Sequence, residues 1–267
     1  MQALYALAAK EFEDHWRNGW IIALALAFAT FSAVISLAGF GLSGQVGVAD
    51  TQTAIISLTS LVIYLIPLMG LLLGIDGIVG ERARGTLDLL RSYPVTTGQL
   101  MLGKLLGLEA VLVTTLLVGL LPPAVLTVLQ GGAWLPWPVF LLLASVLGLV
   151  FLALALLVSA GAREQGTALG IAVALWLLLV ILFDIGLVGL LVATQGNLPQ
   201  AVVQGLFYLN PTSLYRFVSF TLLLDAGALQ EMGLGGAAMP LWSVSLALAL
   251  WGLVPLGLAA WWLRRSE

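Results

Sequence analysis

Few residues in this chain could carry out chemistry of their own. The chain has no cysteine, and its single histidine is His15. Thiolate metal sites, histidine-rich metal clusters, cysteine nucleophiles and Ser-His-Asp triads are therefore excluded. Residues 98–104 have the glycine and lysine spacing of a phosphate-binding loop, but Leu105 follows where such a loop needs Ser or Thr to hold magnesium. We therefore expect no catalytic residue, no metal site and no bound cofactor in this chain.

Three acidic residues lie within or beside long apolar stretches. Asp184 is well inside one of them, and an acid there costs on the order of 2.5–3.5 kcal/mol unless it has a partner. Two hypotheses stay open for Asp184: contact with a substrate or a gate, or a protonated or hydrogen-bonded acid that holds two helices together. Asp76 and Glu109 are at the ends of apolar stretches, where solvation favours a structural role.

The segment 80–104 holds the most distinctive pattern of residue types. Gly85 interrupts the chain, the threonine after it can cap a short helix that carries three leucines, and Pro94 ends that helix. Thr96 and Gln99 then have the spacing of a capping box for a second helix. The leucines need an apolar partner, which a partner protein could supply as a groove. The residues concerned are Glu81, Gly85, Thr86, Leu87, Asp88, Leu89, Leu90, Pro94 and Lys104.

Helices in a membrane must position these residues. Of the 267 residues, 61% are hydrophobic and 9% are charged, whereas a soluble domain carries about 25% charged residues. This excludes an ordinary soluble enzyme, and the net charge of −3 does not suggest nucleic-acid binding. Apolar runs of the roughly 20 residues that a membrane-spanning helix needs occur at 20–40, 55–75, 111–129, 139–159, 169–192 and 241–262. The prediction is an all-α membrane protein with six transmembrane helices. Glycine pairs at 70/74 and 166/170 suit close helix packing.

Basic residues are distributed unevenly between the two sides that six spans create. Nine of the ten lie in the amino-terminal segment, the second loop, the fourth loop or the carboxyl tail. They are Lys10, Arg17, Arg82, Arg84, Arg91, Lys104, Arg163, Arg264 and Arg265. The tenth, Arg216, lies on the opposite side. Because cytoplasmic loops are enriched in Lys and Arg, both termini are predicted to face the cytoplasm.

The amino-terminal segment 1–19 is predicted to form an amphipathic helix. Leu4, Ala8, Phe12 and Trp16 recur every four residues, which places them on one face of a helix. Such a helix lies in the membrane interface with its apolar face towards the lipid. A simple membrane anchor would account for this pattern.

The segment 193–240 is the only long loop on the outer side, and it is itself apolar. Residues 198–209 and 212–224 can each form a short helix. Asn210 and Pro211 separate them, because proline disfavours helix at the residue before it. Neither helix is long enough to span, so both are predicted to dip into the outer leaflet as re-entrant helices.

Two hypotheses account for the polar residues of this outer segment. Tyr215 and Arg216 are residue types that often anchor protein interfaces, which favours docking of an outer partner there. Alternatively, the segment braces itself: Arg216 pairs with Asp225 or Glu231, and Asn210 caps the helix that begins near Pro211.

Taken together, the residues of the second loop resemble the signature of the ABC-2-type transporter permeases. In that family this segment, here 76–108, contains the coupling helix that docks into the ATPase subunit. The amino-terminal helix, with Lys10 and Glu11, is similar to the family's interface helix, and the family closes its outer gate with a re-entrant pair in the place of 193–240. The resemblance covers residues 1–267 and implies a single transmembrane permease domain.

Three segments narrow the resemblance to permeases that serve the maturation of nitrous oxide reductase: 75–81, 183–184 and 210–216. The resemblance implies a cytoplasmic ATPase in two copies, which holds ATP and Mg, together with a second copy of the permease and a periplasmic β-helical protein. It also implies a multi-pass place in the bacterial inner membrane and a role in sulfur supply and copper-site assembly. Direct passage of copper is not expected, because copper prefers Cys, His or Met ligands and only Met69 is clearly inside a span.

The preferred function is therefore the permease subunit of an ATP-driven exporter, which exports a sulfur species or transmits motion to the periplasmic partner. One alternative is an ABC-2 permease that exports another small molecule or a lipid. A second is a secondary transporter driven by protons through Asp184, which inverted repeats with interrupted spans would favour, but no such repeat is apparent. An intramembrane enzyme is disfavoured, since no span contains a metal motif, a cysteine or a histidine.

Overall fold

The computed structural model describes residues 2–17, 19–42, 51–86, 96–224 and 239–265, and the regular structure within these ranges is helical. Leu87, Asp88, Leu89, Leu90 and Pro94 of the predicted coupling segment lie outside the described residues. The described helices are α1 (Gln2–Trp16), α2 (Gly19–Leu42), α3 (Thr51–Ile75), α4 (Val79–Arg84), α6 (Thr97–Leu129), α7 (Pro136–Gly161), α8 (Gln165–Trp176), η1 (Leu177–Leu182), α9 (Phe183–Ala193), α10 (Gln200–Tyr208), α11 (Pro211–Leu223) and α13 (Leu241–Arg265).

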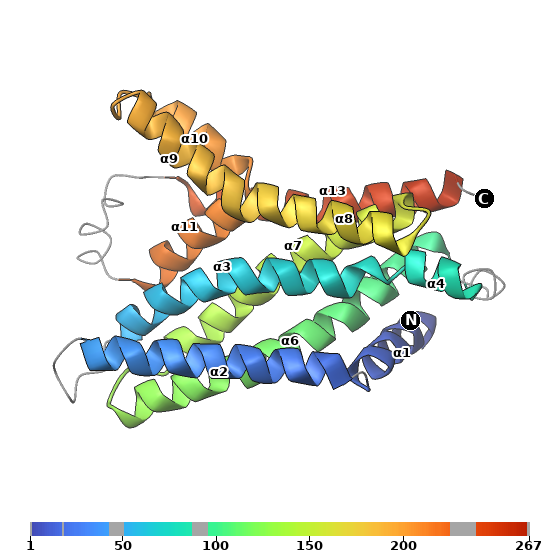
Figure 1. The fold of residues 1–267 in the computed structure, drawn as a ribbon, viewed down its shortest axis with the longest axis horizontal. Coiled ribbons are helices and arrows are strands. Elements are labelled where there is room, and N and C mark those ends of the chain that lie inside the picture. Colours follow the sequence, from blue (N-terminus) through green and yellow to red (C-terminus); the bar gives the residue numbers. More distant parts are fainter. Residues whose placement is uncertain (1, 18, 43–50, 87–95, 225–238, 266–267) are drawn as a thin grey trace.

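The predicted apolar stretches each correspond to a helix or to a run of joined helices. Among the described residues, five helical segments are long and apolar enough to cross a membrane, and a sixth is added if the bent pair α1 and α2 counts as one span. The two helices of that pair meet at an angle of 73°, so α1 runs in a different direction from α2 (Figure 1) and packs against α6. The all-α fold with several apolar helices is confirmed.

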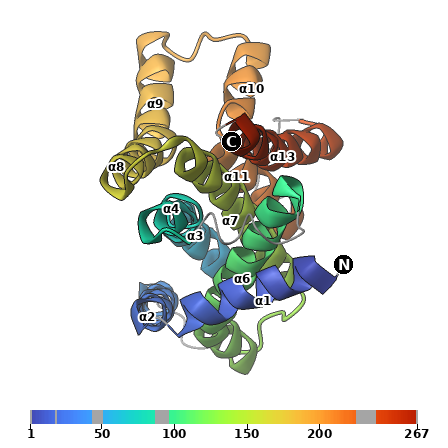
Figure 2. The same cartoon turned by 90° about the vertical axis from the view of Figure 1, so that its right-hand side faces the viewer.

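Helix α7 lies at the centre of the bundle, between α3, α6 and α13 (Figures 1 and 2). Close approach between α3 and α7 depends on the predicted glycine pair in α3. A Cβ atom at Gly70 would lie 3.2 Å from the Gly148 carbonyl oxygen, and one at Gly74 would lie 2.5 Å from the Ala155 Cβ. Small residues at this contact let the two backbones pack closely, as they do in membrane helix pairs. The other predicted pair, Gly166 and Gly170, has no atom of another residue within 4 Å of such a Cβ in the described part of the chain.

The predicted fifth span differs from a regular α-helix. It consists of α8, the π-helical segment η1 and α9, and its direction changes between α8 and α9 (Figure 1). Helices α9 and α10 have no buried residue, and both project away from the bundle (Figure 2). π-helical turns inside α-helices are rare and concentrate at functional sites, and no residue pattern in the sequence predicted this one.

The outer segment forms two short helices, α10 and α11, close to the predicted ranges 198–209 and 212–224. The break at Asn210 and Pro211 is confirmed, and the Asn210 side chain caps α11 by accepting a hydrogen bond from the Thr212 amide at 3.0 Å. These helices lie at one end of the molecule, whereas α1, α4 and the C-terminal end of α13 lie at the other end (Figure 1). The depth of α10 and α11 in a bilayer and the sidedness of the chain stay predictions.

Candidate functional site

Helix α1 crosses the beginning of α6 at the end of the bundle where α4 also lies (Figure 2). Two glycines of α6 permit this crossing. A Cβ atom at Gly103 would lie 2.7 Å from the Leu7 Cβ, and one at Gly107 would lie 2.5 Å from the Ala8 carbonyl oxygen. The apolar stripe predicted for α1 is half-buried, with Ala8 against α6 and with Phe12 and Trp16 against the core of the bundle. Contact of the remaining surface of α1 with lipid stays a prediction.

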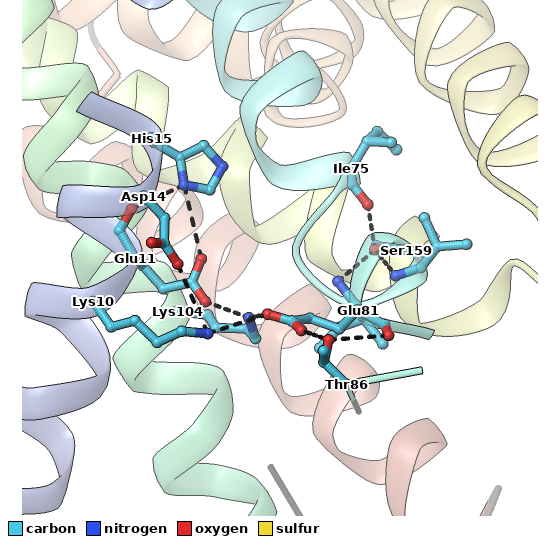
Figure 3. A network of polar contacts seen from close by, with 11 residues as sticks. Lys10, Glu11, Asp14, His15, Ile75, Glu81, Thr86, Lys104 and Ser159 are labelled. Atoms are coloured by element: carbon cyan, nitrogen blue, oxygen red, sulfur yellow. Dashed lines mark hydrogen bonds and ion pairs between the residues drawn. The ribbon is translucent and has the colours of Figure 1, made fainter. Parts of the chain in front are cut away.

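A cluster of charged side chains, of which Glu11, Glu81 and Lys104 are buried, lies where α1, α4 and α6 meet (Figure 3). Lys104 of α6 is 1% exposed, and its ammonium group donates a hydrogen bond to the Glu11 Oε1 of α1. The same nitrogen lies 3.4 Å from the Glu81 Oε1 of α4, which Lys10 of α1 also approaches at 3.5 Å. Two lysines and two carboxylates thus balance in formal charge, and the contacts of the buried Lys104 with both buried acids offset the cost of their desolvation. We call Lys10, Glu11, Glu81 and Lys104 the charge cluster.

Thr86 joins the charge cluster to the start of the predicted coupling segment. Its hydroxyl donates to the Glu81 Oε2, and its backbone amide donates to the Glu81 carbonyl oxygen at 3.0 Å. Gly85 ends α4 in the left-handed region, with a φ of 70°, which glycine adopts without steric cost. The chain break predicted at Gly85 is therefore confirmed, but Thr86 contacts the preceding acid. At the other end of the segment, Thr96 and Gln99 form the predicted capping box.

The chemistry of the charge cluster favours a mechanical role. Ammonium groups can donate hydrogen bonds but cannot accept them, and each one here faces a carboxylate. In the described part of the chain, no group of three or more His, Asp or Glu side chains is arranged to hold a metal ion. The cluster can therefore hold three helices in one arrangement, directly beside the residues that lead into the coupling segment.

A second set of polar contacts lies at the opposite end of the bundle. The Arg216 Nη2 donates to the Asp184 Oδ2 at 2.7 Å and so links α11 to α9. The Asn210 side-chain amide donates to the Leu179 carbonyl oxygen of η1 at 2.7 Å. The intramembrane acid thus has a basic partner, which is the arrangement that lowers the cost of a charge there. Asp225 and Glu231, the acids predicted to pair with Arg216 if the segment braces itself, lie outside the described residues.

The environments of several predicted site residues differ from expectation. Tyr215 is 1% exposed, so its side chain packs inside this chain and does not present the surface that an interface anchor needs. Lys104, predicted as part of the ATPase-coupling signature, is equally buried and acts through Glu11 and Glu81. Asp76, in contrast, is exposed as expected for an acid at the end of a span, and the Gln165 side-chain amide donates to its Oδ1 at 2.9 Å.

Sequence reasoning missed the role of Glu11 in the charge cluster. A usable signal was present, because Glu11 lies three residues after Ala8 and seven after Leu4 and is therefore beside these residues on one face of α1. An acid on the apolar face of an amphipathic helix must find a buried cation. The sequence does not say which cation, and Lys104 follows 93 residues later.

Comparison with known proteins identifies the family. The family model described as ABC-2 family transporter protein matches residues 5–267. The chain is 39% identical to the probable ABC transporter permease protein NosY of Pseudomonas aeruginosa, over 279 aligned positions that cover 99% of each chain. It is 36% identical to the protein of the same name from Stutzerimonas stutzeri, with 94% of this chain and 93% of that protein covered. The chain therefore belongs to the ABC-2 transporter family and is a multi-pass permease subunit of an ABC transporter.

Proposed function

We propose that this permease is moved by a cytoplasmic ATPase that docks on the segment 85–96 and on α1. The observation that carries the proposal is the charge cluster, which ties both docking elements to the start of α6. A displacement of either element would act on Lys104, because its ammonium group is shared by Glu11 and Glu81. ATP and Mg would be bound by the ATPase, and this chain would contribute the membrane path.

The resemblance of the segments 75–81, 183–184 and 210–216 supports a more specific proposal for the function, and the relatives are ABC transporter permeases named NosY. We infer a role in the maturation of the copper site of nitrous oxide reductase, through export of a sulfur species or through motion passed to a periplasmic β-helical protein. The absence of cysteine from the sequence supports sulfur export or motion over direct copper passage. Export of another small molecule or a lipid by the same coupling is the alternative.

The active unit would contain two copies of this chain and two copies of the ATPase. The fifth predicted span supports this inference, because α9 has no buried residue and α8 buries two, Ala168 and Ala172. A native mass measurement of the active complex tests the stoichiometry, and a single permease copy would refute it.

The Arg216–Asp184 pair bears on the proton-driven alternative. The Asp184 carboxylate already has a basic partner within this chain, because the Arg216 Nη2 donates to its Oδ2 at 2.7 Å. The pair therefore accounts for an acid at this position without proton transport.

Charge substitutions at the coupling segment test the main proposal. Leu87→Asp and Glu81→Arg should leave the protein inserted but uncouple it, because they add repulsion at a helix-in-groove contact and in the charge cluster. Arg84→Lys is the matched control, since Arg84 is exposed on the same short helix and keeps its charge. The measurements are co-purification of the ATPase and maturation of the reductase in cells. If both are unchanged in Leu87→Asp and Glu81→Arg, the coupling assignment is wrong.

A further inference from the structure

The helical structure is interrupted between α3 and α4, shortly before Glu81. Helix α3 ends at Ile75 and α4 begins at Val79. The first amides of a helix have no partner inside that helix, and here they are buried, with Ile78 and Val79 both 0% exposed. Such buried donors need a partner from elsewhere in the protein.

One side chain of the central helix supplies that partner. The Ser159 Oγ of α7 accepts hydrogen bonds from the Ile78 amide and the Val79 amide, both at 2.9 Å. The same hydroxyl donates to the Ile75 carbonyl oxygen, so it bridges the end of α3 and the start of α4 (Figure 3). A serine hydroxyl has one donor and two acceptor positions, and all three are used here. Ser159 is itself 0% exposed.

A second contact fixes α4 to the end of the same helix. The Arg82 guanidinium donates to the carbonyl oxygens of Ala162 and Ala160, the latter at 3.4 Å. These carbonyls belong to the C-terminal end of α7, where backbone acceptors lack helical partners and a positive charge is favourable. Helix α4 is therefore held by α7 through Ser159 and Arg82, and by α6 and α1 through Glu81.

We propose that Ser159 and Arg82 are positioning residues that transmit movement of the coupling segment through α4 into α7. This inference rests on the proposed function, since it needs an ATPase that moves the segment. The charge cluster acts on one side of α4, whereas Ser159 and Arg82 pass the displacement to the helix that packs against α3, α6 and α13. Without them, α4 would still follow the ATPase, but α7 would not.

Single-cysteine reporters test the transmission in the assembled complex, because the native chain has no cysteine. An environment-sensitive fluorophore is placed on α4 at Ala83, which is exposed, or on α7 at Leu142, which is 63% exposed. In the complex with the ATPase, ATP should change the signal of both reporters. In Ser159→Ala combined with Arg82→Gln, the α4 reporter should still respond. The α7 response should fall at least roughly tenfold, because Ser159→Ala alone removes three hydrogen bonds and the loss of one buried hydrogen bond already corresponds to a factor of about ten.

Matched variants separate transmission from a general loss of structure. Ser145→Ala removes a hydroxyl from the same helix that donates to the Leu141 carbonyl oxygen at 2.8 Å, and both reporters should respond as in the native chain. Ser159→Thr alone keeps a hydroxyl at the bridging position, and in this variant the α7 reporter should respond to ATP as in the native chain.

Each remaining outcome overturns the inference in a distinguishable way. An unchanged α7 response in Ser159→Ala with Arg82→Gln, while Leu87→Asp still uncouples the complex, refutes Ser159 and Arg82 as positioning residues and leaves the proposed function intact. No ATP response of either reporter in the native complex refutes the proposed coupling, and the inference with it. Loss of the α4 response in the double variant also refutes the inference, because movement of the coupling segment then does not reach α4 independently of Ser159 and Arg82.

Discussion

Replacing Lys104 by methionine should release α1 from the bundle. Lys104 is 1% exposed and lies between the carboxylates of Glu11 and Glu81. Methionine fills the volume of the lysine stem but leaves both acids without this cation. Glu81 keeps Lys10 at 3.5 Å, whereas Glu11 is left with the His15 Nδ1 at 3.9 Å among its described partners. The free-energy cost of the uncompensated charge therefore arises mainly at Glu11, the buried acid of α1.

The free-energy cost of Lys104→Met follows from the burial of the Lys104–Glu11 ion pair. Removing one member of a buried ion pair costs about 3–5 kcal/mol. We take the lower end, about 3 kcal/mol, because Glu81 keeps a cation and α1 can move outwards until Glu11 is hydrated. At 1.36 kcal/mol for each factor of ten, the population with α1 detached should rise roughly 100-fold.

Hydrogen exchange measured by mass spectrometry on the chain in lipid nanodiscs checks this value. The amides of residues 2–16 should exchange roughly 100-fold faster in Lys104→Met, since exchange reports local opening. Lys10→Met is the matched control: the Lys10 side chain is 46% exposed, and exposed ion pairs contribute about 0–1 kcal/mol. Adding Glu11→Gln to Lys104→Met removes the uncompensated charge and should restore most of the protection. Unchanged exchange in Lys104→Met, or faster exchange in the double variant than in the single one, would refute the reasoning.

Thermal unfolding in detergent should separate three further contacts. Asp184→Asn should cost about 1 kcal/mol, because the ion pair is partly exposed, and adding Arg216→Gln should cost little more if the two side chains act as a pair. Asn210→Ala should cost about 2 kcal/mol, since a helix cap and a buried bond to the π-helix are both lost. Gly119→Ala should cost about 1–3 kcal/mol, as its Cβ would lie 1.8 Å from a buried ring of α2, whereas Gly98→Ala meets no atom within 4 Å and should be neutral.

The helices and their local signals could be predicted from the sequence, because these depend on neighbouring residues. A continuous apolar run predicted residues 55–75, and α3 occupies Thr51–Ile75. The capping box at Thr96 and the break at Asn210 were also confirmed. Each of these features depends on one continuous stretch of sequence, so the local chain contains the information that determines it.

The partners of buried polar groups could not be predicted in the same way. Glu11 and Lys104 are 93 residues apart, and Asp184 and Arg216 are 32 apart. Which acid meets which base depends on how the helices cross, and a sequence of apolar spans allows many crossings. The packing of Gly70 and Gly74 was predicted. The same spacing at Gly166 and Gly170 meets no packing partner within 4 Å among the residues that the structure describes, because the pattern does not specify whether a partner helix is present.

The charge cluster also imposes an order on the biosynthesis of the protein. Glu11 leaves the ribosome 93 residues before Lys104, a delay of roughly 5–20 seconds at 5–20 residues per second. During that interval the carboxylate has no buried cation, so α1 must wait in water or at the lipid surface while the first and second predicted spans are made. Docking of α1 can follow only after Lys104, near the start of α6, has emerged. The docked α1 therefore marks a nascent chain whose first two predicted spans have been made.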